Sequence, residues 1–131
     1  MKVLASDYDG TLRTGEMVDT KDVEAIHAFR EQGNVFGLVT GRSMESIKKE
    51  IERNGFEFDF IIANNGGVVY DANFNKLQCL YMDFNKALDI ISYIKTLDCV
   101  SFVINDGYNR YKVRVDENQI DHKYGDMAEV T

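Results

Sequence analysis

The sequence predicts an α/β fold in which parallel strands alternate with helices. Between residues 2 and 63, short apolar runs alternate with longer segments whose apolar residues recur every three or four positions. The order strand, helix, strand, helix, strand is typical of right-handed βαβ units. Each of the three apolar runs is followed by a polar turn that contains glycine. Because ligands of such sheets bind at the carboxyl ends of the strands, the three turns together predict one site.

The first predicted strand, residues 2–7, leads into the segment Asp7-Tyr8-Asp9-Gly10-Thr11-Leu12. Its continuous apolar run is the pattern of a strand buried on both faces. Residues two apart on a strand point to the same side, so the carboxylates of Asp7 and Asp9 would project together. Two carboxylates this close repel each other unless a cation or a shared proton relieves them. The segment therefore predicts a divalent metal site or an acid/base pair, and the alternative is a solvated turn.

The remaining elements follow from apolar periodicity and from turn residues. After a loop or small flap over 10–19, we expect helix 20–32, strand 34–39, a helix from a cap near Ser43 to Asn54, and strand 59–63. Beyond residue 67 we expect a hairpin of strands 68–71 and 76–81, helix 85–97, and strands 100–104 and 110–115 around Asn105-Asp106-Gly107. The pattern divides the chain into 1–66, a second α/β unit over 67–121, and a tail over 122–131 without clear periodicity.

The overall composition is that of a soluble globular protein. The chain has 131 residues, of which 44% are hydrophobic and 28% charged. The net charge of -7 argues against nucleic acid as a partner, since nucleic-acid binding needs a basic surface. The sequence has no apolar run of the roughly 20 residues that a membrane span needs, and no signal-peptide pattern opens it. We therefore expect a cytoplasmic protein without a membrane partner.

The two cysteines, Cys79 and Cys99, have no metal-ligand or redox spacing. Both lie among apolar residues, which favours buried free thiols over a disulfide.

The three polar turns resemble motifs of the haloacid dehalogenase-like (HAD) superfamily. Asp7 to Leu12 matches its first motif, Asp-x-Asp-Gly-Thr-Leu, and Val39-Thr40-Gly41-Arg42 looks like its second motif in the form of the Cof-type, subfamily IIB, sugar-phosphatase branch. The segment Ile62 to Gly67 resembles the turn at which that branch inserts its cap domain. The resemblance covers about residues 1–120. It implies a Rossmann-like three-layer core, here with a partial parallel sheet, and an inserted α/β cap segment.

The resemblance also implies an activity: a Mg²⁺-dependent phosphatase that acts on small phosphorylated metabolites such as sugar phosphates. Asp7 would be the nucleophile that forms an aspartyl-phosphate. Asp9 would protonate the leaving oxygen and then deprotonate the attacking water. The carboxylate of Asp7 and the main-chain carbonyl of Asp9 would hold Mg²⁺.

The phosphate would be bound by groups from all three turns. The Thr40 hydroxyl, the N–H groups of Gly10, Thr11 and Gly41, and the Arg42 guanidinium are the candidates that the motifs supply. Asn65, in the third turn, is a further candidate. Two structural alternatives stay open here: Thr40 and Gly41 could form only the capping turn of the next helix, and residues 64–67 could be a structural turn.

Two elements of the family pattern are not found in the sequence. The third-motif lysine has no convincing counterpart, and the segment 125–129 shares only the start of the fourth motif, Gly-Asp-x-x-Asn-Asp. The family's strand order would also leave strand 2–7 at an exposed edge. We expect either a fragment of a longer enzyme or a chain that covers this edge as a homo-oligomer or with another chain.

The sequence is compatible with two functions other than a phosphatase. A truncated or degenerate HAD module could bind phosphate or a partner without turnover. A phospho-acceptor signalling domain also clusters aspartates in a parallel sheet, but it expects its acceptor aspartate later in the chain, and strand 59–63 ends in Ile62-Ala63-Asn64 without one.

Overall fold

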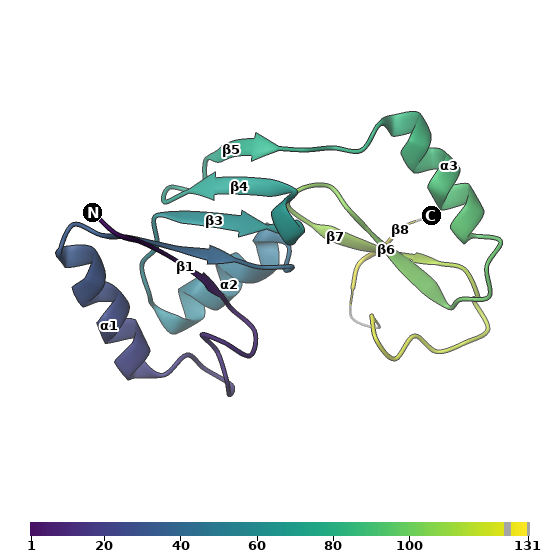
Figure 1. Ribbon diagram of the computed structural model, residues 1–131. Helices are drawn as coiled ribbons and strands as arrows, with labels where there is room; N and C mark the ends of the chain where they lie inside the picture. Colours follow the sequence, from purple (N-terminus) through teal and green to yellow (C-terminus); the bar gives the residue numbers. More distant parts are fainter. Residues whose placement is uncertain (125–126, 131) are drawn as a thin grey trace. The chain divides into compact units, whose positions relative to one another are not determined.

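The computed structural model describes residues 1–124 and 127–130, and it divides the chain into two compact units, Met1–Leu80 and Tyr81–Thr131 (Figure 1). The first unit holds a five-stranded sheet in the order β1-β2-β3-β4-β5. Its strands are β1 (Val3–Asp7), β2 (Val35–Val39), β3 (Phe60–Ala63), β4 (Val68–Asp71) and β5 (Lys76–Cys79). The first three strands are parallel, and β4 and β5 are antiparallel to their neighbours. The predicted α/β class is confirmed.

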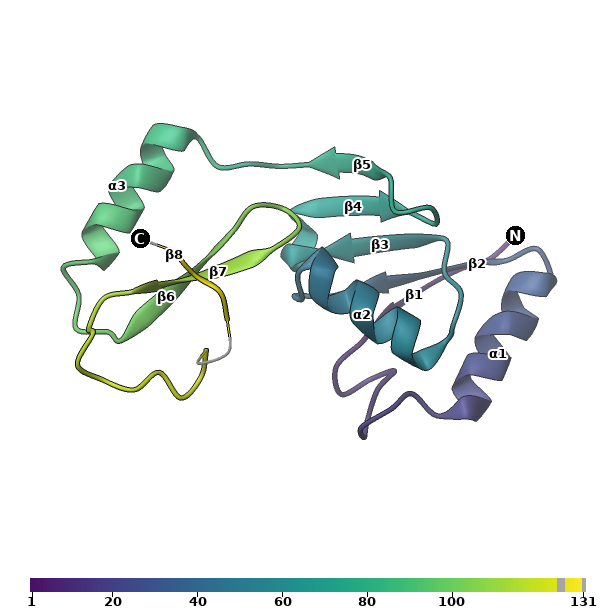
Figure 2. The same cartoon turned by 180° about the vertical axis from the view of Figure 1, so that it is seen from behind.

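Two helices connect the parallel strands, α1 (Thr20–Glu31) and α2 (Met44–Asn54). The Asp19 carboxylate caps α1 by accepting the N–H of Lys21 at 2.8 Å, and Ser43 caps α2. Gly55 ends α2 in the left-handed conformation, with a φ of 71°, that glycine adopts without steric cost. Figure 2 shows α2 against one face of the sheet.

The core of this unit lies between the sheet and these two helices. Its fully buried side chains are Tyr8, Phe36, Leu38, Met44, Ile47, Ile61 and Val68. Ile26 of α1 joins the same cluster, so both helices contribute to one core. Burying each large apolar side chain contributes about 1.5–3 kcal/mol, so the core anchors the central strands β2, β3 and β4.

The first strand differs from its predicted burial on both faces. Val3 is 61% exposed and Leu4 47% exposed. The reason is position, because β1 pairs with β2 on one side only and forms the edge of the sheet, as the family's strand order implied. An open groove of about 530 Å³ lies beside it, lined in part by Leu4, Ile26 and Phe36. That a second copy or another chain covers this edge stays a prediction.

The end of the first unit lies beyond the predicted boundary at residue 66. The hairpin of β4 and β5 continues the sheet, since β4 pairs with β3 in the register Ile62 opposite Val69. The N–H of Leu80 then donates to the carbonyl of Gly67 at 2.9 Å, and the compact unit ends at Leu80. The boundary is set by the antiparallel pairing of β4 with β3. The order of elements along the chain does not reveal that pairing.

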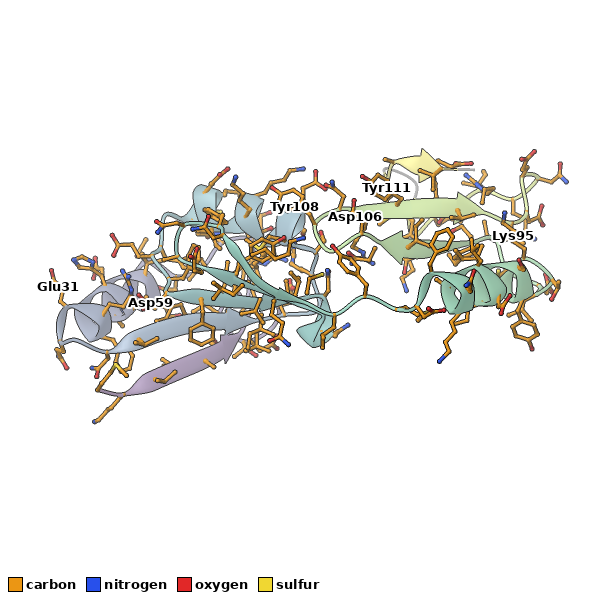
Figure 3. The ribbon with its side chains drawn as sticks, turned by 90° about the horizontal axis from the view of Figure 1, so that it is seen from above. Glu31, Asp59, Lys95, Asp106, Tyr108 and Tyr111 are labelled. Carbon is orange, nitrogen blue, oxygen red and sulfur yellow. The ribbon has the colours of Figure 1, made fainter. Side chains whose placement is uncertain are left out.

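A salt bridge ties α1 to the end of the sheet opposite the polar turns. Arg30 donates to both carboxylate oxygens of Asp59, at 3.0 and 2.8 Å, and the N–H of Phe36 donates to the same carboxylate at 2.9 Å. Figure 3 labels Asp59, which directly precedes β3, and Glu31, the last residue of α1. The hydrogen bonds from Arg30 hold the pKa of Asp59 below its ordinary value.

The second unit consists of α3 (Phe84–Ile94) and the strands β6 (Ser101–Asn105), β7 (Arg110–Arg114) and β8 (Glu129–Val130). The hairpin of β6 and β7 forms at the predicted turn, where the Asp106 carboxylate accepts the N–H groups of Tyr108 and Asn109 at 2.9 and 2.7 Å (Figure 3). Helix α3 ends three residues before the predicted Leu97, because the N–H and the hydroxyl of Thr96 both donate to the carbonyl of Tyr93 in a tighter turn.

Two further expectations are answered in this part of the fold. The tail, whose sequence has no clear periodicity, contains the short strand β8, which pairs with β7 in parallel. Cys79 and Cys99 are free, as predicted, but they are half-buried and not buried. No helix in the described part of the chain is long and apolar enough to cross a membrane.

The central position of β2 predicts how two leucines differ. Leu38→Ala, at a fully buried site, should lower the free energy of unfolding by about 2–5 kcal/mol in a urea titration. Leu77→Ala, on β5 where the side chain is 63% exposed, is the matched control and should change it by less than about 0.5 kcal/mol. Equal losses for the two variants would contradict this description of the core.

Candidate active site

The polar turns that follow β1, β2 and β3 meet at one edge of the first unit. Backbone hydrogen bonds link the second and third turns: Asn65 N–H donates to the carbonyl of Thr40 at 3.1 Å, and Asn64 N–H donates to that of Arg42 at 3.0 Å. The Arg42 side chain links the second turn to the first by contacting Asp9. The structure thus places the sequence-predicted residues of all three turns together.

Asp7, the last residue of β1, presents an exposed carboxylate. One carboxylate oxygen accepts the N–H of Tyr8 at 2.8 Å, and the other accepts the Thr11 hydroxyl at 3.3 Å. These two bonds orient the group and leave lone pairs on both oxygens. The Asp7 carboxylate is therefore an oriented, accessible anion, as a nucleophile or metal ligand must be.

Asp9 is held by two arginines. Arg42 donates from Nε and Nη2 to the two carboxylate oxygens at 2.7 and 2.8 Å, which is the bidentate geometry of strong charge-assisted bonds. Arg13 adds a third contact at 3.3 Å from Nη2. The hydrogen bonds from Arg42 hold the pKa of Asp9 below its ordinary value, although partial burial opposes the shift. Asp9 is consequently a carboxylate rather than a carboxylic acid at neutral pH.

The first turn is closed by its own backbone. Gly10 has a φ of 77°, a left-handed conformation that favours glycine, and its N–H donates to the carbonyl of Arg13 at 2.9 Å. The N–H of Thr11 donates to the carbonyl of Tyr8 at 3.2 Å. These two N–H groups, which the motif offers as phosphate donors, are thus engaged within the turn.

The second and third turns fit closely against each other. Thr40 is 4% exposed, and its hydroxyl oxygen accepts the N–H of Arg42 at 3.0 Å. Ser43, not Thr40, is the N-cap of α2, and Thr40 belongs to the turn that precedes it. A Cβ added to Gly41 would lie 2.8 Å from the side-chain oxygen of Asn65, so any larger residue here would require the Asn65 side chain to move. Asn65 itself has a left-handed backbone, with a φ of 55°.

Sequence reasoning missed three residues that the structure brings to this cluster: Tyr8, Arg13 and Glu50. The Tyr8 hydroxyl donates to Glu50 at 2.7 Å, and Arg13 donates to Glu50 at 3.2 Å. Burial raises the pKa of Tyr8 to about 12, and the neighbouring Glu50 carboxylate adds to the shift. One signal was available, because Ser46, Glu50 and Asn54 recur every four residues and form a polar stripe on α2.

The donor set of the site decides which metal it fits. Among residues 1–124 and 127–130, no three His, Cys, Asp or Glu residues gather as a metal cluster. The carboxylate of Asp9 is bound by arginines, which leaves the Asp7 carboxylate and main-chain carbonyls as oxygen donors. Mg²⁺ suits such a set, because it binds through one or two carboxylates and takes its other ligands from water and phosphate.

The chain is similar to known phosphatases over most of its length. A family model described as haloacid dehalogenase-like hydrolase matches residues 4–129. A protein of Buchnera aphidicola (subsp. Schizaphis graminum), named only as a candidate phosphatase, is 31% identical over 94% of this chain and 44% of its own length. A 5-amino-6-(5-phospho-D-ribitylamino)uracil phosphatase of Bacillus subtilis is 28% identical over 82% of this chain and 37% of its own length. The chain therefore spans less than half the length of these two relatives.

Solved structures share the fold. A structure described as a HAD subclass IIB sugar phosphatase superposes with a TM-score of 0.75 at 17% identity, and it covers all of this chain and 53% of its own. At this identity the similarity supports the fold alone, and the fold it supports is the predicted HAD-type α/β architecture.

The contact between Arg42 and Asp9 predicts a measurable change in ionisation. Arg42→Gln should raise the pKa of Asp9 toward its ordinary value, because the hydrogen bonds from Arg42 are the main cause of its depression. An NMR titration of side-chain carboxyl carbons, with Asp9 assigned through Asp9→Asn, measures the shift. Lys49→Gln is the matched control, since it removes one charge from a residue that pairs with Glu45 on α2. An unchanged Asp9 pKa in Arg42→Gln would refute the assignment.

Proposed function

The chain belongs to the haloacid dehalogenase-like hydrolase family, and we propose that it carries the nucleophile and acid/base of a Mg²⁺-dependent phosphatase. The observation that supports this most is the arrangement at the end of β1. An exposed Asp7 carboxylate lies two residues before Asp9, which Arg42 holds in a bidentate contact. Phosphoester hydrolysis by this route needs a nucleophile and an acid/base. The free carboxylate of Asp7 can serve as the nucleophile and the arginine-bound carboxylate of Asp9 as the acid/base.

In the first chemical step, a carboxylate oxygen of Asp7 attacks phosphorus and the bond from phosphorus to the ester oxygen breaks. The leaving oxygen takes a proton from Asp9, and the product is an aspartyl-phosphate on Asp7. In the second step, Asp9 takes a proton from water, the water oxygen attacks phosphorus, and Asp7 is released with inorganic phosphate. The two steps return both carboxyl groups to their starting states.

Asp9 must carry a proton in the first step and lose it before the second. The contact with Arg42 stabilises the ionised form, which is the form that accepts a proton from water. Because Asp9 is ionised before substrate binds, it must take a proton from solvent before the first step, and this requires Arg42 to shift some of its hydrogen bonds from Asp9 to the substrate phosphate. Arg42 has five N–H donors, so it can contact both groups.

The phosphate would lie against the second and third turns. The Thr40 hydroxyl accepts the N–H of Arg42, which leaves its proton free to donate to a phosphate oxygen. Gly41 lets this turn approach the third one, where Asn65 offers a side-chain amide. The N–H groups of Gly10 and Thr11 would contribute only by sharing the bonds that now close the first turn.

The residues present fit Mg²⁺ as the cofactor. The Asp7 side chain and the main-chain carbonyl of Asp9 would hold it. When bound, the ion neutralises the charge that the phosphate and the Asp7 carboxylate bring together.

Small phosphorylated metabolites such as sugar phosphates are the proposed substrates. Support comes from relatives, since one is named for a phosphorylated ribitylamino compound and one similar structure is described as a sugar phosphatase. We place the reaction in the cytoplasm, where such metabolites are made, with the phosphorylated metabolite as the partner and no role for nucleic acid or a membrane.

One observation favours a second candidate. A Mg²⁺ site completed by further carboxylates is not found among the described residues, which contain no acidic cluster of three. That observation favours a HAD module that binds phosphate or a partner without turnover.

Hydrolysis of p-nitrophenyl phosphate with and without Mg²⁺ separates the two candidates. We expect turnover that chelation of Mg²⁺ abolishes, and a loss on the order of 10² or more in Asp7→Asn, which removes the nucleophile. Glu24→Gln on α1 is the control, since it removes an exposed carboxylate outside the turns and should keep the activity. A wild-type rate no higher than that of Asp7→Asn would leave only the binding module.

A further inference from the structure

We propose that Glu50 is a positioning residue of this site: it fixes the two arginines that hold Asp9. The role rests on the proposed function, because it gives the acid/base carboxylate a fixed orientation. Glu50 lies on α2 and belongs to none of the three turns, so no motif assigns it. It acts through Arg13 and Arg42 and not through a hydrogen bond to Asp7.

The carboxylate of Glu50 is the centre of a compact network. Its side chain is only 13% exposed. One oxygen accepts the Tyr8 hydroxyl at 2.7 Å and Arg53 at 3.2 Å, and the other accepts Nη1 of Arg13 at 3.2 Å. Nη1 of Arg42 lies 3.6 Å from that second oxygen. A carboxylate that is mostly buried and has this many donors is held in one position.

Each of the two arginines reaches from Glu50 to Asp9. Arg13 uses Nη1 for Glu50 and Nη2 for Asp9. Arg42 places Nη1 near Glu50, where the Ser46 hydroxyl also accepts it at 2.8 Å, and uses Nε and Nη2 for Asp9. The negative carboxylates of Glu50 and Asp9 thus alternate with the positive guanidiniums of Arg13 and Arg42. A planar guanidinium fixed at one edge presents its other edge in a defined direction.

The aromatic ring of Tyr8 contacts both guanidiniums. Their central carbons lie 5.7 Å (Arg13) and 5.6 Å (Arg42) from the centroid of the buried Tyr8 ring, within the range of cation–π attraction. The Tyr8 hydroxyl in turn donates to Glu50. Tyr8 therefore connects the first motif to α2, and Glu50 is the acceptor that fixes both the ring and the arginines.

Loss of the Glu50 charge should free the arginines without unfolding the chain. Glu50→Gln keeps the size of the side chain and an oxygen that accepts the Tyr8 hydroxyl, but it removes the counter-charge of Arg13 and Arg42. Glu52→Gln is the matched control, because Glu52 is exposed on the same helix and loses the same charge. Circular dichroism spectra that match the wild-type spectrum establish that both variants are folded.

The direct test is NMR of ¹⁵N-labelled arginine side chains, which needs no catalytic activity. In the wild-type protein, rotation of the Arg13 guanidinium should be slow, because carboxylates hold both Nη1 and Nη2. In Glu50→Gln its rotation should be at least about tenfold faster, the change expected when a hydrogen bond to a charged group is lost. Arg42 should change less, because its Nη1 also donates to Ser46 and Asp9 still holds its other edge. Glu52→Gln should match the wild type. Equally slow rotation in Glu50→Gln would overturn the proposal.

A kinetic comparison shows whether catalysis uses this positioning. Glu50→Gln should lower kcat on glycerol phosphate, whose alkoxide must be protonated, by at least about tenfold, and kcat on p-nitrophenyl phosphate, whose leaving group needs little help, by less than about threefold. Equal losses on both substrates would overturn the catalytic part of the role. If the wild-type protein hydrolyses neither substrate, the proposed function fails, while the NMR comparison still decides whether Glu50 positions the arginines.

Discussion

The bidentate ion pair between Arg42 and Asp9 is the interaction on which the site depends. It joins the turn after β1 to the turn after β2, and the backbone bonds of residues 64 and 65 then join the third turn. It also gives the two aspartates different states. Asp9 is bound and ionised, while Asp7 keeps free lone pairs at the end of β1. This one ion pair therefore holds the motif residues together, and it binds Asp9 while Asp7 stays accessible.

Apart from this contact, the positions of the three turns depend on the sheet that carries them. The strands beneath the turns are anchored by a core around Phe36, Leu38 and Ile61, so the positions of the turns follow from β2 and β3. The strand that carries Asp7 is different, because β1 is an edge strand with exposed apolar residues. Asp7, the proposed nucleophile, thus lies on an exposed edge strand of the sheet, and hydrogen bonds from the Tyr8 N–H and the Thr11 hydroxyl orient its carboxylate. Any partner that pairs with β1 would fix the nucleophile as well as protect the edge.

Much of this could be predicted from the sequence, because it depends on local patterns. Strand and helix periodicity placed the elements to within a few residues, and the glycine-containing turns placed the site residues at strand ends.

Burial of β1 was predicted wrongly, since an apolar run indicates burial but not how many neighbours a strand has. The unit boundary at Leu80 depends on β4 pairing with β3, a contact between segments that no local pattern encodes. Arg13 and Glu50 were missed for the same reason: their contacts cross from one turn to a helix 37 residues away. The sequence shows the polar stripe on α2, but it does not show that Tyr8 and Arg13 contact it.

Phosphorylation of Asp7 is the most direct test of the central claim, which is that the free carboxylate at the end of β1 is the nucleophile. The folded protein can be incubated with acetyl phosphate and Mg²⁺, quenched in acid and analysed by mass spectrometry of its peptides. We expect one phosphoryl group on the peptide that contains Asp7, and none in Asp7→Asn. A wild-type protein that binds phosphate but never carries a phosphoryl group on Asp7, or that carries it on Asp9, would contradict it.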